Sequence, residues 1–144
     1  MEFIHLDSAT GPHPQFSNDR IAHFLEVHLD QFGDRREDIL KCLAYVFDPH
    51  RGGFVVLAVD GDAVQGAVVV NETGMGGYIP ENILVYIAVD RALRGQGLGR
   101  TLMQEALTRA KGAVALHVEP DNPARKLYEA LGFTNKYLEM RLHR

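Results

Sequence analysis

A chain of 144 residues is long enough for one domain with a packed core, and its 46% hydrophobic and 24% charged residues are usual for a globular protein. The formal net charge of -4 argues against a nucleic-acid partner, because phosphate contacts require a basic protein face. Cys42 is the only cysteine, which excludes an internal disulfide and a cysteine-based metal site. It lies on the apolar side of a predicted helix, where we expect a buried hydrophobe rather than a reactive thiol. No segment reaches the ~18 apolar residues that a membrane span requires, so we expect a cytoplasmic protein. We also expect a single domain over residues 1–144 and no metal site.

The first third of the chain predicts one strand and two helices. Residues 2–6 alternate between polar and apolar side chains, as a short strand does. From residue 17 to residue 32 the apolar residues keep helical spacing, and a glycine ends the run. Asp34 followed by Glu37 has the pattern of a capping box, which predicts that a second helix begins there and extends to Phe47.

The middle of the chain predicts a β-hairpin and a buried strand. Residues 54–59 and 63–70 are rich in β-branched side chains and flank an Asp-Gly turn, which is a strong hairpin signal. A glycine-rich connection over residues 71–82 follows, and long loops in small domains are often functional. The run ILVYIAV, residues 83–89, is apolar on both faces, so we expect a central strand that helices cover on both sides.

The last third of the chain predicts two helices and two strands. An apolar stripe indicates a helix from residue 98 to residue 110, and AVALHV, residues 113–118, indicates the strand that returns from it. A strand, a helix and a returning strand imply a parallel, right-handed crossover. Asn122 is a suitable N-cap for a further helix, and YLEMRL, residues 137–142, predicts a last strand. Together these elements indicate an α/β fold with a mixed sheet.

The stretch RALRGQGLGRTL, residues 91–102, joins the buried strand to the next helix and contains three glycines. A dinucleotide-binding turn of the form G-x-G-x-x-G, read from the first of them, would need its third glycine where the chain has Arg100. A nucleotide P-loop would need Gly-Lys-Ser or Gly-Lys-Thr, and the chain has neither. Both of these phosphate-binding turns are therefore disfavoured.

The pattern that remains is R-x-x-G-x-G, formed by Arg94, Gly97 and Gly99. Glycines let the backbone turn tightly and approach an anion without a Cβ in the way. Successive N–H groups at a helix N-terminus favour a negative group such as a pyrophosphate, and Arg94 and Arg100 add positive charge beside it. A plain glycine turn with solvated arginines is the alternative interpretation.

Two phrases of the sequence resemble motifs of the GNAT superfamily of N-acetyltransferases. IAVDRALRGQGLGRTLM resembles the acetyl-coenzyme A motif Q/R-x-x-G-x-G/A, and HVEPDNPARKLYEALGF resembles the motif that follows, with Leu-Tyr, a short spacer and Gly-Phe. Family members commonly have an asparagine seven residues before this tyrosine; here Asp121 holds that place and Asn122 comes one later. The resemblance covers about residues 53–143. It implies one N-acetyltransferase domain, with helices on both faces of a mixed sheet that is splayed between its fourth and fifth strands.

The resemblance implies that coenzyme A lies in the gap where these two strands separate. Backbone groups of Ile87, Ala88 and Val89 would pair with the pantetheine arm as a neighbouring strand would. Asn122 caps the last helix and is also expected to reach the cofactor. The glycine turn would hold the pyrophosphate, which makes the following residues candidates for cofactor binding: Arg94, Gly95, Gln96, Gly97, Leu98, Gly99 and Arg100.

The resemblance also implies direct transfer of an acetyl group to an amine. A backbone amide near residues 87–89 would stabilise the oxyanion, and Tyr128 would protonate the departing thiolate. Packing of Tyr128 in an amphipathic helix is the alternative. His117 is a candidate base, because the pKa of a histidine suits proton abstraction near neutral pH. The other candidate bases are Glu81, Glu119, Glu72 and a chain of water molecules.

The expected acceptor is a primary amine of a small molecule, a peptide or a protein. The N-terminal helices, the 71–82 connection and the last strand would surround it, and acidic side chains there would suit a cationic acceptor. We expect neither nucleic acid nor a membrane as partner, while the sequence leaves the acyl chain and the oligomeric state, a homodimer included, undecided. A module that senses acyl-coenzyme A without turnover is the competing hypothesis.

Overall fold

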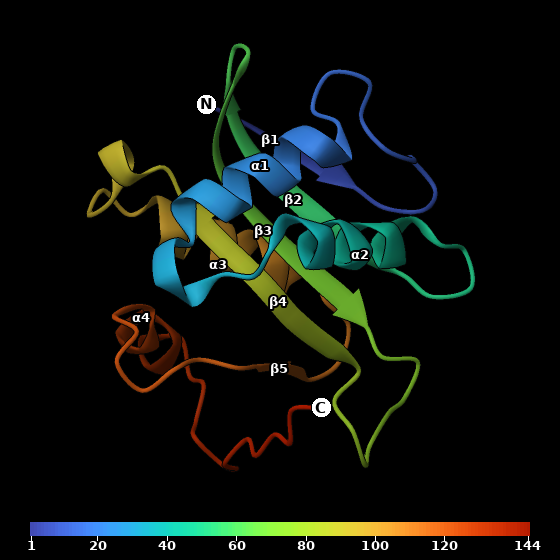
Figure 1. Ribbon diagram of the computed structural model, residues 1–144, viewed down its shortest axis with the longest axis vertical. Coiled ribbons are helices and arrows are strands. Elements are labelled where there is room, and N and C mark those ends of the chain that lie inside the picture. The colour runs from blue at the N-terminus through green and yellow to red at the C-terminus, as the bar shows by residue number, and fades with distance from the viewer.

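The computed structural model describes residues 1–144 and contains a five-stranded sheet (Figure 1). The strands follow one another across the sheet in chain order, and every neighbouring pair is antiparallel except β4 and β5, which are parallel. The predicted mixed α/β sheet is confirmed. None of the helices has both the length and the hydropathy that a membrane crossing needs.

The elements are β1 (Glu2–Leu6), α1 (Asn18–His28), η1 (Asp30–Phe32), α2 (Arg36–Phe47), β2 (Gly53–Asp60), β3 (Ala63–Glu72), β4 (Asn82–Val89), η2 (Arg91–Leu93), α3 (Leu98–Arg109), β5 (Val114–Leu116) and α4 (Ala124–Ala130), where η1 and η2 are single 3-10 turns.

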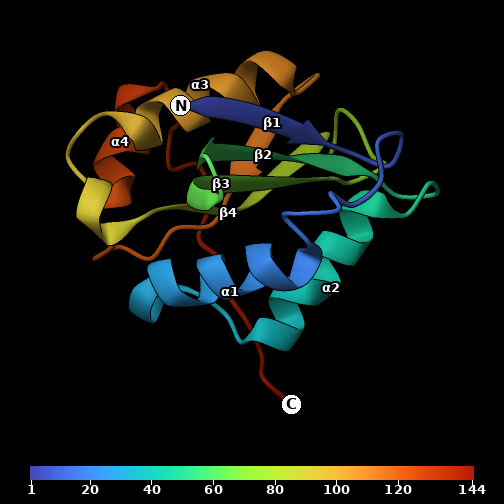
Figure 2. The same cartoon turned by 90° about the horizontal axis from the view of Figure 1, so that it is seen from above.

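Alternation along the strands builds two hydrophobic cores, one on each face of the sheet. In β2, Val55 and Leu57 pack with residues of α1 and α2, whereas Phe54 and Val56 pack with residues of α3 and α4. Figure 2 shows the same division, with α1 and α2 on one side of the sheet and α3 and α4 on the other. Because both faces are covered, β2 is apolar at nearly every position, as a strand buried on both sides must be.

A β-bulge in β4 marks the point where β4 and β5 separate. Leu84 and Tyr86 lie opposite consecutive residues of β3, so Val85 has no partner of its own. Val85 and Tyr86 consequently both pack against the core under α1 and α2. β5 pairs with β4 only over Asn82–Leu84, so the second half of β4 has no neighbour on that side. The splay that the family resemblance implies is confirmed.

Asn82 holds together the end at which β4 and β5 remain paired. Its side chain is only 2% exposed, and its Nδ2 donates to the carbonyl oxygens of Lys111 at 2.7 Å and Ala113 at 3.3 Å. Its backbone N–H also donates to Ala113, at 3.1 Å. These bonds tie the start of β4 to the connection between α3 and β5. The two strands can therefore diverge only toward the other end, where the glycine turn follows β4.

The predicted last strand is wrong. Residues 134–144 contain neither helix nor strand. An alternating sequence forms a strand only where a neighbouring strand supplies hydrogen bonds and a core covers one face, and this segment has neither. Its large apolar side chains are between 77% and 91% exposed: Tyr137, Leu138, Met140 and Leu142.

The start of the second helix also differs from the prediction. The N-cap of α2 is Arg35, which makes no side-chain capping bond, so Asp34 and Glu37 do not form a capping box. Asp34 instead accepts a hydrogen bond from the Tyr86 hydroxyl, across the core. The first helix ends at His28, and the rest of its predicted span forms η1.

Gly53 is the position in the sheet least able to accept a side chain, since its φ is +132° and a Cβ would lie 2.0 Å from the Val70 carbonyl oxygen. We expect Gly53→Ala to lower the free energy of unfolding by about 3 kcal/mol or more, because the β3 backbone would have to move. Gly77 also has positive φ, but a Cβ there meets nothing within 4 Å, so Gly77→Ala should cost only about 1 kcal/mol. Urea unfolding of both variants measures the difference, and equal losses would contradict the prediction.

Candidate functional site

Six successive backbone N–H groups at the start of α3 donate no hydrogen bond within the protein. They belong to residues Gly95–Arg100, which we call the amide row; the next amide, that of Thr101, donates to the Gly97 carbonyl oxygen at 3.1 Å. Most of the amide row is exposed. It therefore presents an uninterrupted series of donors to solvent, at the end of the helix where the dipole is positive.

Two left-handed glycines shape the amide row. Gly95 has φ +79° and Gly97 has φ +86°, and Gly97 is the N-cap of α3. A Cβ at either position would meet nothing within 4 Å, so it is the backbone conformation, not crowding, that requires glycine. An open hollow of about 300 Å³ borders the turn, with Phe3, Leu93 and Leu98 among its lining residues. The space around the row is thus open to a ligand.

The Arg94 side chain is bound to the end of α1. Its Nη1 lies 3.0 Å from Asp30 Oδ2, and its Nη2 donates to the His28 carbonyl oxygen at 2.6 Å. Its guanidinium is therefore already bound to the Asp30 carboxylate, which it shares with Arg91. Arg100, which is exposed, is the other cationic side chain that the sequence assigns to the turn.

The second half of β4 leaves backbone groups unpaired. The Asp90 N–H donates to the Gln65 carbonyl oxygen at 2.9 Å, on the β3 side. Backbone groups of an antiparallel strand alternate in direction, so those of Ala88 also face β3, while those of Ile87 and Val89 face the side that β5 has left. Of the three predicted backbone contacts, Ile87 and Val89 are the two that a ligand in the gap could reach.

α4 packs where the amide row and the open half of β4 meet. A Cβ at Gly99 would lie 3.7 Å from side-chain atoms of both Leu127 and Val89. The next residue, Tyr128, is 7% exposed and belongs to the core under α3 and α4. The fold thus brings α4, the helix that contains Tyr128, to the end of the sheet where the amide row lies (Figure 1).

The Tyr128 hydroxyl makes no hydrogen bond within the protein, and it is not sealed from solvent. Burial raises the pKa of Tyr128 to about 12. The group therefore keeps its proton throughout the neutral range and can donate it. Packing against Phe133, with ring centroids 6.1 Å apart, explains the position of the ring but not the free hydroxyl.

The other predicted residues are dispersed. Asn122 Oδ1 accepts from the Ala124 N–H at 2.9 Å, but the N-cap of α4 is Pro123, one residue later than predicted. His117 is exposed just beyond β5, and Glu119 is exposed further along the same connection. Glu81 lies against Gly112, at the paired start of β4. Glu72 ends β3, so the candidate bases are distributed over different strands and connections.

A hydrogen bond between Tyr86 and Asp34 was not predicted. The Tyr86 hydroxyl donates to Asp34 Oδ2 at 2.6 Å, although the residues are 52 positions apart. Burial, followed by the neighbouring Asp34 carboxylate, raises the pKa of Tyr86. Asp34 is itself exposed, so its carboxylate stands at the surface on the α1–α2 side of β4, where the connection to α2 crosses the sheet in Figure 1. The sequence gives no signal for a contact between segments so far apart.

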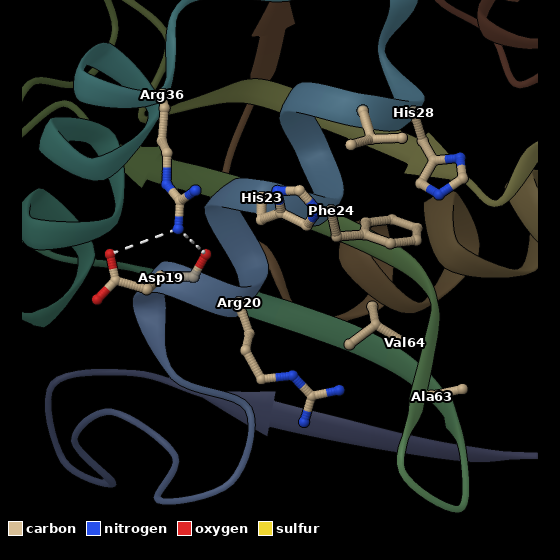
Figure 3. Close-up of a pocket in the computed structure, with 9 residues that line it drawn as sticks. Asp19, Arg20, His23, Phe24, His28, Arg36, Ala63 and Val64 are labelled. Atoms are coloured by element: carbon tan, nitrogen blue, oxygen red, sulfur yellow. Dashed lines mark hydrogen bonds and ion pairs between the residues drawn. The ribbon is translucent and has the colours of Figure 1, made fainter.

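A further hollow, of about 460 Å³, lies elsewhere, between α1 and the start of β3 (Figure 3). Its cations already have partners: Arg36 Nη2 lies 3.8 Å from Asp19 Oδ1, and Arg20 Nη2 donates to the Asp62 carbonyl oxygen at 2.6 Å. It contains none of the residues that the sequence motifs predict. No group of three His, Cys, Asp or Glu side chains is arranged to hold a metal ion.

Sequence comparison identifies the family. The sequence profile of the Acetyltransferase (GNAT) family matches residues 14–133, which is most of the chain. The chain belongs to this family. The resemblance drawn from the two motifs is therefore confirmed, and the protein belongs to a family of transferases.

Individual relatives agree with this assignment. N-alpha-acetyltransferase RimI of Mycobacterium tuberculosis (strain H37Rv) is 43% identical over 60 residues, which make up 40% of this chain and 38% of RimI. A solved "probable acetyltransferase" has a TM-score of 0.72 at 19% identity, over 100% of this chain and 98% of its own. An aminoglycoside N-acetyltransferase in complex with CoA has a TM-score of 0.69 at 12% identity, over 99% and 93%. At such identities the two structures support the fold alone.

Cys42 is not suited to covalent catalysis. Its Sγ lies 3.3 Å from Asn71 Oδ1, and burial raises the pKa of the thiol to about 12. At pH 8 only about one part in ten thousand is thiolate, the reactive form. We expect iodoacetamide at pH 8 to label Cys42 in the urea-unfolded protein and not in the folded one, as measured by mass spectrometry. Rapid labelling of the folded protein would contradict this.

Proposed function

We propose that the protein is an acetyl-coenzyme A-dependent N-acetyltransferase, which transfers the acetyl group directly to a primary amine of a small molecule or a peptide. The observation that carries this proposal is the amide row beside the open half of β4. Six free N–H groups at a helix N-terminus fit a pyrophosphate, and the adjacent unpaired strand fits an extended amide-containing arm. Coenzyme A contains both groups in this order.

Binding would use the main chain more than side chains. The amide row would donate to the pyrophosphate, and backbone groups of Ile87 and Val89 would pair with the pantetheine arm. Arg100 would add positive charge at the surface. Asn122 would act at the start of α4, where its side chain already orders the helix that carries Tyr128.

In the transfer step, the thioester supplies an activated acetyl group, and the residues of this chain handle charge and protons. An outward N–H of β4, near Ile87 or Val89, would stabilise the oxyanion, because a fixed donor there needs no reorganisation. Tyr128 would give its proton to the departing sulfur. Because burial raises the pKa of Tyr128, the phenol is protonated at neutral pH and has a proton to donate.

The amine would approach from the face opposite Tyr128. Tyr86 and Tyr128 belong to the two different cores, so the Asp34 carboxylate and the Tyr128 hydroxyl lie on opposite faces of the sheet. A carboxylate at the surface, already oriented by a hydrogen bond, suits an incoming ammonium group. We retain His117 and a water chain as the routes by which the ammonium loses its proton. The partial match to RimI adds support for a peptide N-terminus as acceptor.

A first test uses coenzyme A and a panel of amines. We expect coenzyme A to raise the melting temperature, and acetyl-coenzyme A to release free thiol in the presence of at least one amino acid, polyamine or N-terminal peptide. Binding without thiol release across the panel would favour an acyl-coenzyme A sensor. Absence of binding would contradict both functions.

A second test removes one hydroxyl. Tyr128→Phe should lower kcat by about 10²-fold or more at unchanged KM for acetyl-coenzyme A, since general acid catalysis typically contributes this much. Tyr137→Phe is the matched control, because Tyr137 is 79% exposed and should leave both constants unchanged. A rate within about twofold of wild type for Tyr128→Phe would rule out the acid role.

A further inference from the structure

Asp30 joins two arginines from the segment that precedes the amide row. Its Oδ1 accepts from Arg91 Nε at 2.7 Å, and its Oδ2 accepts from Arg94 Nη1 at 3.0 Å. Each arginine is more than 60 positions from Asp30 in the sequence, so these contacts link η1 to η2 and the residue that follows it. Hydrogen bonds from Arg94 and Arg91 lower the pKa of Asp30, so it stays ionised at neutral pH.

The same two arginines also close the end of α1. Arg91 Nη2 donates to the Val27 carbonyl oxygen and Arg94 Nη2 to that of His28, each at 2.6 Å. The Arg91 backbone N–H donates to His28 Nδ1 at 3.2 Å. Carbonyls in the last turn of a helix lack intrahelical partners, and cations there are favoured by the helix dipole. The end of α1 and the start of the glycine turn thus form one hydrogen-bonded unit around Asp30.

The backbone of Asp30 is unusual as well. With φ +55°, it is the only non-glycine residue of the chain in the left-handed region. Aspartate tolerates this conformation better than most residues, but not without cost. In this conformation the Asp30 carboxylate accepts hydrogen bonds from both arginines, which offset the conformational cost. A left-handed residue that only ended the helix would more commonly be glycine.

We propose that Asp30 is a positioning residue for the acyl donor. By holding Arg91 and Arg94 against the end of α1, it fixes the orientation of the backbone that leads into the amide row. Arg94 then acts through Asp30 rather than on the pyrophosphate, whose ligands are the amides. A movement of α1, which packs on β4 on the side of the sheet opposite Tyr128, would be transmitted to the donor site through these bonds. This inference rests on the proposed function, since it takes coenzyme A as the ligand.

Asp30→Gly tests the proposal while it keeps the left-handed backbone, which glycine adopts freely. We expect the dissociation constant of coenzyme A, measured by titration calorimetry on the full chain, to rise about tenfold, as two charged hydrogen bonds are lost. The KM for acetyl-coenzyme A should rise alike, with kcat unchanged at saturation. Asp30→Asn, which keeps an acceptor and tolerates positive φ, should recover part of the affinity. Asp19→Asn, which breaks the ion pair with Arg36 near the other end of α1, should change nothing.

A double-mutant cycle separates positioning from direct contact. If Arg94 acts through Asp30, then Arg94→Ala weakens binding about as much as Asp30→Gly, and the double variant is no weaker than the weaker single variant. If Arg94 binds the pyrophosphate itself, Arg94→Ala weakens binding while Asp30→Gly leaves it unchanged or strengthens it, which would overturn the proposal. Should Asp30→Gly fail to fold, as judged by its melting temperature, Asp30→Asn takes its place in the cycle. If the wild-type protein does not bind coenzyme A, both the proposed function and this inference are overturned. If the wild-type protein binds coenzyme A and both Asp30 variants bind it equally well, only this inference is overturned.

Discussion

Beyond Leu84, β4 has a hydrogen-bonded neighbour only on its β3 side, and the remaining backbone groups of a half-buried strand must find another partner. The bulge at Val85 starts this separation, and the buried Asn82 side chain prevents it from spreading to the other end. The amide row follows the unpaired segment after Asp90, η2 and Arg94. The break in sheet pairing thus leaves an open strand edge close to the free donors at the start of α3.

The same break places different chemistry on the two faces of the sheet. The bulge turns Val85 and Tyr86 toward α1 and α2, and Tyr86 in turn holds Asp34 at the surface. Tyr128, on α4, belongs to the opposite core and keeps a free, protonated hydroxyl. A ligand in the gap would meet a carboxylate from one side and a phenol from the other. This polarity suits a reaction in which a cation arrives and a thiolate departs.

Local signals in the sequence were sufficient for much of this arrangement. The hairpin, the buried β4 and the glycine turn depend on residues close together in the chain, where propensity and periodicity act. The contacts of Asp30 and Asp34 depend on partners more than 50 positions away, and no local pattern encodes such pairs. Asp34 was misassigned because its spacing to Glu37 matches a capping box, while the buried Tyr86 hydroxyl competes for the same carboxylate. Residues 137–142 have the alternation of a strand, but a strand also needs a neighbour, which sequence alone cannot supply.

Because the amide row is made of main-chain groups, its donors do not depend on the side chains that carry them. Substitutions at Gln96, Leu98 or Arg100 leave the N–H groups in place as long as Gly95 and Gly97 keep their left-handed conformations. The proposed acceptor site, by contrast, would depend on side chains such as Asp34. If the proposed function holds, substitutions can alter the choice of acceptor while the main-chain donor site persists, so one scaffold could diverge into enzymes with different amine preferences and a common source of acetyl groups.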